Sequence, residues 1–106
     1  MNKTHVDVTV RFKGSGSTPF REMIRECNFG FDAAEDTNAN VLDEEIVEVE
    51  EADGNWFVTV DLLIQHNDNN LDEIIREMDY GFTVSPEHDY EITSTKITNW
   101  TITDSR

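Results

Sequence analysis

The chain has few of the residues that stabilise secreted proteins or form membrane spans. Its 106 residues contain a single cysteine, Cys27, so no intrachain disulfide can form, as is usual in a reducing cytoplasm. No apolar run approaches the roughly 18 residues that cross a bilayer as a helix. The first residues also lack the apolar stretch of a signal peptide. We therefore expect a cytoplasmic protein with no membrane partner.

Basic residues are missing from the middle of the chain. Residues 26–75 contain no Lys or Arg but hold fifteen Asp and Glu, whereas the remaining 56 residues hold eight acidic and eight basic side chains. The formal net charge of −15 therefore arises in this middle segment. Because such a charge repels nucleic acid and anionic lipid, we expect neither as a direct partner.

The chain contains an internal repeat. Residues 20–31 (FREMIRECNFGF) align 51 positions later with residues 71–82 (LDEIIREMDYGF), and six of the twelve positions are identical. These matches predict two copies of one unit. Residues 5–51 and 55–103 form the copies, within a single domain that comprises residues 1–106.

Each copy is expected to contain a strand, a short helix and a second strand. Apolar and polar residues alternate in the strands, as in sheets with one buried face. Apolar residues at i, i+3/i+4 and i+7 from Phe20 and from Leu71 predict the helices, which would end near Gly30 and Gly81. The four predicted strands are residues 5–12, 41–51, 56–64 and 90–103.

Two further features fix how the strands are connected. Ile46 and Val49 lie three positions apart, as do Ile97 and Trp100, so we expect a β-bulge at the same place in both copies. The dipeptide at residues 53–54, Asp-Gly, favours a tight hairpin between the copies.

Two strand–helix–strand units joined by a hairpin indicate an α+β, ferredoxin-like βαββαβ fold. We therefore expect a four-stranded antiparallel sheet, of strand order 4-1-3-2, with two helices on one face. The alternative is a dimer in which two chains exchange these units.

The densest acidic segment lies on the second predicted strand and the turn after it. The sister strand of the second copy carries Thr, Lys, Asn, Thr and Ile where this strand has Glu44, Glu45, Glu48, Glu50 and Glu51, so the fold does not require the carboxylates. They either protect a sheet edge and keep the protein soluble, or form an anionic surface for a basic groove built for DNA or RNA. The candidate partner-binding residues are Asp43, Glu44, Glu45, Glu48, Glu50, Glu51 and Asp53.

The last predicted strand has a different character. It is rich in threonine and includes Ile97, Trp100 and Ile102, so it has high β-propensity and little charge. An edge of this kind can extend a sheet across a two-fold axis. We therefore also consider a homodimer formed through these three residues, or a core position for Trp100.

No group of residues has the spacing of a catalytic or metal site. The three histidines, His5, His66 and His88, are widely separated and are expected at the surface, and Cys27 is expected to fill the core. Residues 36–40 and 68–72 match only the start of a calcium loop, which leaves weak calcium binding open. We therefore expect no enzyme activity, no cofactor and no dedicated metal site.

The helix, the aromatic-Gly-Phe segment and the strand from Ile92 to Trp100 resemble small acidic accessory proteins of bacteriophages. Some such proteins inhibit host defence nucleases or transcription factors, several by imitating DNA. The resemblance thus implies an inhibitor that presents carboxylates to a basic host protein, one that itself binds nucleic acid, in the host cytoplasm. The alternative function is structural: a homo-oligomer built through the last strand, whose acidity serves only solubility.

Overall fold

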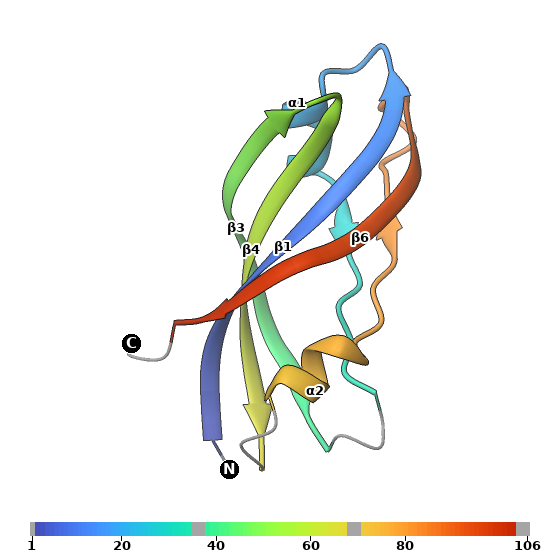
Figure 1. The fold of residues 1–106 in the computed structure, drawn as a ribbon. Coiled ribbons are helices and arrows are strands. Elements are labelled where there is room, and N and C mark those ends of the chain that lie inside the picture. The colour runs from blue at the N-terminus through green and yellow to red at the C-terminus, as the bar shows by residue number, and fades with distance from the viewer. Residues whose placement is uncertain (1, 35–37, 68–70, 104–106) are drawn as a thin grey trace.

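The computed structural model describes residues 2–34, 38–67 and 71–103. The described residues are mostly β-structure, with 61% in strands or bridges and 12% in helices, and Figure 1 shows the four long strands crossing one another. The elements in chain order are β1 (Asn2–Gly16), α1 (Phe20–Arg25), β2 (Asn28–Phe29), β3 (Asn40–Ala52), β4 (Asn55–His66), α2 (Leu71–Arg76), β5 (Phe82–Thr83) and β6 (Tyr90–Ile102).

Four long strands form one antiparallel sheet in the order β3-β4-β1-β6. Numbered among the long strands alone, this is the predicted order 4-1-3-2. The alternation of apolar and polar residues explains this sheet, because every second residue of the central strands β1 and β4 points to one face and is buried there. The fully buried residues of this inner face are Val6, Val8, Val10, Val58, Val60, Leu62 and Ile64.

The prediction of a ferredoxin-like α+β fold with two helices covering one face is wrong. Each helix has only six residues and is about 9 Å long, too short to form a layer over 12- to 15-residue strands. The helices lie at opposite ends of the sheet, and extended chain runs between them (Figure 1). One and a half turns are enough to bury the apolar residues of α1, which are Phe20, Met23 and Ile24. A longer helix was therefore not needed to bury them.

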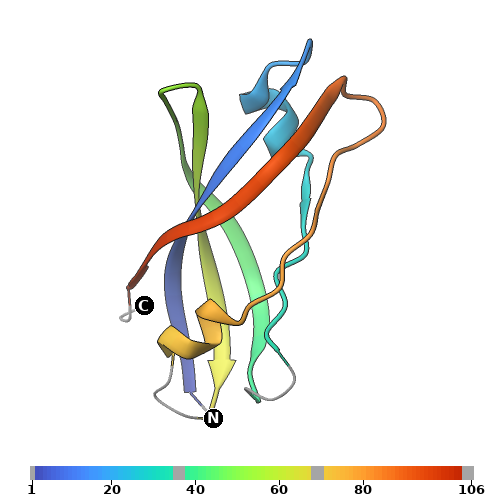
Figure 2. The same cartoon turned by 45° about the vertical axis from the view of Figure 1, so that its right-hand side comes forward.

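The extended segments form a second, two-stranded sheet of β2 and β5. Figure 2 shows these segments side by side, on the same side of the large sheet as the helices. Aromatic rings fill the space between the layers: Phe82 packs edge-on against Phe12 and Phe29, with ring centroids 4.6 and 5.0 Å away. Gly30 permits the pairing, because a Cβ there would lie 3.1 Å from the Gly81 carbonyl oxygen. The prediction that the helices end near Gly30 and Gly81 is wrong, because they end at Arg25 and Arg76 and neither glycine has the positive φ of a helix-terminating residue.

The repeat appears in space as a pseudo-two-fold axis. Repeat-equivalent residues face each other on it: Thr9 opposes Thr59, with their hydroxyl oxygens 3.2 Å apart, and the Gly30 N–H donates to the Gly81 carbonyl at 3.0 Å. The copies are interleaved, because β3 of the first pairs with β4 of the second, and β6 of the second pairs with β1 of the first. Each edge strand therefore pairs with the other copy.

The predicted bulges are confirmed. The register of β3 on β4 shifts at Val47, and that of β6 on β1 shifts at Thr98, which is the equivalent position. A second pair of bulges, at Leu42 and Thr93, is also equivalent. The hairpin prediction is confirmed as well, since residues 53 and 54 connect β3 to β4 with φ angles of 52° and 78°.

Candidate functional site

β3 is an edge strand whose outward side carries most of its acidic residues. The bulges at Leu42 and Val47 interrupt the alternation, so that Val41, Ile46 and Val49 still reach the core. The carboxylates on the outward side are those of Asp43, Glu45, Glu48 and Glu50. We call these four residues the acidic edge.

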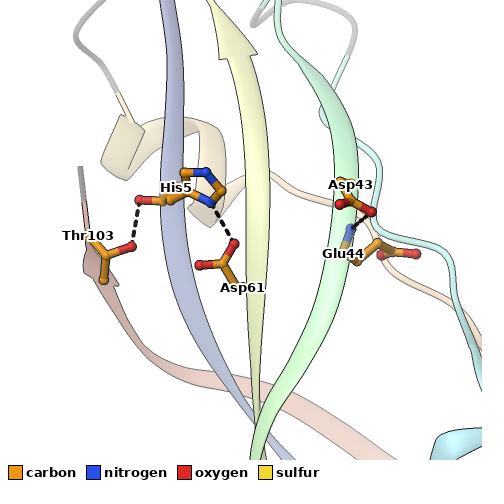
Figure 3. Close-up of polar contacts among 5 residues, drawn as sticks. All are labelled: His5, Asp43, Glu44, Asp61 and Thr103. Carbon is orange, nitrogen blue, oxygen red and sulfur yellow. Dashed lines mark hydrogen bonds and ion pairs between the residues drawn. The ribbon is translucent and has the colours of Figure 1, made fainter. Parts of the chain in front are cut away.

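The other three predicted partner-binding residues lie elsewhere. Glu44 is paired with Leu62 of the inner face and points toward the chain around Phe31 (Figure 3). Glu51 lies near Tyr90 at the end of the sheet, where its charge adds to burial in raising the pKa of the Tyr90 hydroxyl. Asp53 occupies the hairpin turn. The structure thus brings together four of the seven residues and separates three from them.

The acidic edge is not neutralised by neighbouring cations. Among the residues that the structure describes, none of its four carboxylates forms an ion pair. Arg21 of α1 is near but is otherwise occupied, because its guanidinium donates to the Val49 carbonyl at 2.9 Å and lies over the Trp56 ring at 5.4 Å. A side-chain hydrogen bond with Glu50, together with the charge of that residue, raises the pKa of Glu48. The two carboxylates are therefore close enough to repel one another.

More carboxylates continue from the acidic edge across the open face of the sheet. Glu45 is paired directly with Asp61 of β4, and Asp61 with Asp7 of β1. Asp61 is buried, and the His5 Nδ1 donates to its carboxylate at 2.7 Å (Figure 3). Like charges at directly opposed positions are unfavourable, so the His5 contact compensates one member of the row.

Apolar side chains are exposed between the acidic residues of β3. Leu42 and Val47, the two bulge residues, are 46% and 51% exposed. Their equivalents on β6 are threonines, and there the hydroxyls of Thr93 and Thr98 donate to β1 carbonyls at 3.1 and 3.4 Å. The same scaffold positions are thus polar on one edge and apolar on the other. An alignment of the two copies already shows this difference in the sequence.

The predicted oligomer edge is not one surface. Ile97 and Trp100 pack against the hydrophobic core, and the Trp100 indole N–H donates to Asp72 of α2 at 2.7 Å. Only Ile102 is largely exposed, at 46%. Trp100 is thus partly buried against the core and not one of its buried residues, and the homodimer stays a prediction.

The histidines are not the exposed residues that we expected. His66 is buried against the Thr4 hydroxyl at 2.8 Å, and His88 contacts the Glu26 carboxylate. Cys27 is a core residue as predicted, and burial raises the pKa of its thiol to about 11. Within the described ranges no three His, Cys, Asp or Glu side chains are grouped to hold a metal. The calcium-loop stretches at residues 36–40 and 68–72 fall partly outside those ranges.

Comparison with known proteins adds no identity to this picture. No family model matches the sequence, and no curated protein or solved structure matches it either. In the part of the chain that is described, neither helix has the length and apolar character needed to cross a bilayer.

Proposed function

We propose that the protein is an acidic binding protein whose acidic edge binds the basic surface of another protein. The observation that carries this proposal is the contrast between the two edge strands. At the positions of Asp43, Glu45, Glu48 and Glu50, the equivalent strand has Ser94, Lys96, Asn99 and Thr101 in the same scaffold. Because β6 occupies its edge without those carboxylates, they are available for a role other than folding.

The charge density of the acidic edge bears on the kind of partner. Four carboxylates are placed over the seven residue steps from Asp43 to Glu50, roughly 23 Å at about 3.3 Å per residue. That is an average spacing of about 8 Å between neighbouring charges, compared with 3.4 Å between phosphates along a single DNA strand. The edge is therefore suited to a short row of Lys and Arg, and it imitates only part of a phosphate backbone.

Leu42 and Val47 add an apolar component to this surface. Protein interfaces combine apolar contacts with charged rims, whereas a purely electrostatic shield needs no exposed aliphatic side chains. We propose a partner with a basic, partly apolar surface. In line with the resemblance to phage accessory proteins, this is a host protein that binds nucleic acid, held by the acidic edge in place of its nucleic acid.

The test exchanges the acidic edge for its sister residues. The variant Asp43→Ser, Glu45→Lys, Glu48→Asn, Glu50→Thr changes the net charge from −15 to −10. A control variant, Glu22→Gln, Glu77→Gln, Glu87→Gln, Glu91→Lys, makes the same change at exposed positions outside β3. Each protein is immobilised, and bacterial proteins are captured at about 50 mM and 500 mM salt and identified.

We expect the wild type and the control to retain the same basic protein at low salt and to lose most of it at high salt. The sister-residue variant should remain folded by circular dichroism and should not retain that protein. Equal capture by the two variants would show that only net charge matters. Capture that does not weaken with salt would argue against an electrostatic interface.

A further inference from the structure

A groove on the inner side of β6 is the least explained feature of the molecule. It consists of two pockets of about 340 and 240 Å³ between β6 and the chain around β5. Thr95 and Phe82 line the larger pocket, Arg76 and Lys96 line the smaller, and Tyr80 lines both. This groove faces away from the acidic edge and is not part of the function proposed above.

The equivalent place in the first copy is occupied by a side chain of the protein itself. Glu44 is the repeat equivalent of Thr95, and both are paired with inner-face residues, Leu62 and Phe12. Burial raises the pKa of the Glu44 carboxyl, and the backbone of Phe31 beside it partly offsets this effect. The Glu44 Oε2 oxygen is buried and has no hydrogen-bond partner among the described residues. Figure 3 shows this side chain directed at the neighbouring chain. The first copy therefore contains a carboxylate where the second copy has a pocket.

The backbone of the second copy offers the matching donor. In the pairing of the two extended segments, residues 32 and 79 exchange both hydrogen bonds, at 2.9 Å each. In an antiparallel ladder the neighbouring pairs direct their N–H groups outward, and Phe31 does so toward Glu44. Phe82 and Phe29 of β2 form another pair of this outward-directed type. The N–H of Phe82 therefore points away from β2 and toward the pocket lined by Thr95.

We propose that the β6 groove binds a small organic carboxylate with an apolar body. The ligand carboxylate takes the place that Glu44 takes in the first copy and accepts hydrogen bonds from the Phe82 N–H and the Thr95 hydroxyl. The apolar body lies against Tyr80 and Trp100, which line the continuation of the groove. Arg76 supplies positive charge there.

The net charge of −15 does not prevent this binding. The acidic edge lies on β3, three strand spacings from β6, which is about 14 Å at roughly 4.8 Å per spacing. The screening length at physiological salt is only about 8 Å. The charge of the acidic edge is therefore largely screened from a ligand in the groove.

The test uses 3-phenylpropionate as the probe and 3-phenylpropanamide as its neutral control. Both are titrated into the ¹⁵N-labelled full chain, and the amide resonances are followed. We expect saturable shifts at Phe82 and Thr95 with the carboxylate and at least about tenfold weaker binding of the amide, because a charged acceptor forms the stronger hydrogen bond. Equal affinities for the two probes, or shifts confined to other parts of the sheet, would overturn the proposal.

Two variants use the repeat as an internal control. Thr95→Glu places in the second copy the side chain that the first copy has, and we expect it to abolish the shifts at Phe82. Glu44→Thr opens the equivalent place in the first copy, and we expect new shifts at Phe31 and a stoichiometry of two probes instead of one. Probe binding that is unchanged in both variants would refute the carboxylate site, and the Glu44→Thr result stands even if Thr95→Glu does not fold.

Discussion

The contact between His5 and Asp61 allows the sharpest prediction of stability. His5→Ala removes a 2.7 Å hydrogen bond to a buried carboxylate. Hydrogen bonds to charged groups contribute about 1.5–3 kcal/mol, and we expect about 2 kcal/mol here because Asp61 has a further interaction. A chain of 106 residues unfolds with an entropy of about 0.2 kcal/mol/K, so the melting temperature should fall by roughly 9 °C.

Thermal and urea unfolding followed by circular dichroism measure this effect. Lys3→Ala, on the exposed part of the same strand, is the control and should change the free energy of unfolding by less than about 0.5 kcal/mol. A double-mutant cycle with Asp61→Asn isolates the pairwise energy. If His5→Ala behaves like the control, or if the cycle gives no coupling energy, His5 does not offset the repulsion between Asp61 and its acidic neighbours Glu45 and Asp7.

Three further predictions concern single side chains. Burial raises the pKa of Glu44 in the folded state, so ionised Glu44 disfavours folding. The variant Glu44→Gln should therefore increase the free energy of unfolding at pH 7, measured in urea. This increase should vanish as the pH falls through the raised pKa. Burial raises the pKa of Cys27 from 9.0 to about 11, so the free energy of unfolding should decline as the pH rises from about 9 to 11. For the same reason, iodoacetamide at pH 8 should modify the native thiol at least about 100-fold more slowly than the thiol of the protein unfolded in urea. Trp100→Phe removes the hydrogen bond to Asp72 and should lower the melting temperature by about 5 °C without changing the mass measured by light scattering, whereas a change in mass would place Trp100 in an interface.

The long strands could be predicted from the sequence because their determinants are local. Alternation of Val6, Val8 and Val10 requires one buried face, and the Asp53-Gly54 dipeptide sets the hairpin. Given the repeat, these two facts leave few strand orders, and the predicted order was confirmed. The bulge at Val47 was also readable, since the spacing of Ile46 and Val49 fits no regular strand.

The second layer could not be predicted in the same way. The segment around Phe29 follows an apolar helical pattern, so it resembled a helix end, yet it is extended because it pairs with a segment more than fifty residues away. That pairing is a tertiary interaction, and it overrides the local signal. The inward direction of Glu44 was missed for a related reason: two bulges on one strand determine its face, and only one of them was recognised.

The interleaving of the copies has a consequence for how the protein is made. β1 is synthesised before both of its sheet neighbours, because β4 and β6 belong to the second copy and β6 ends at residue 102. The sheet can therefore be completed only after β6 has been synthesised, and pairing between such distant segments is slow. During that interval the nascent first half has an exposed apolar face, and the carboxylates of β3 on the same half oppose its aggregation.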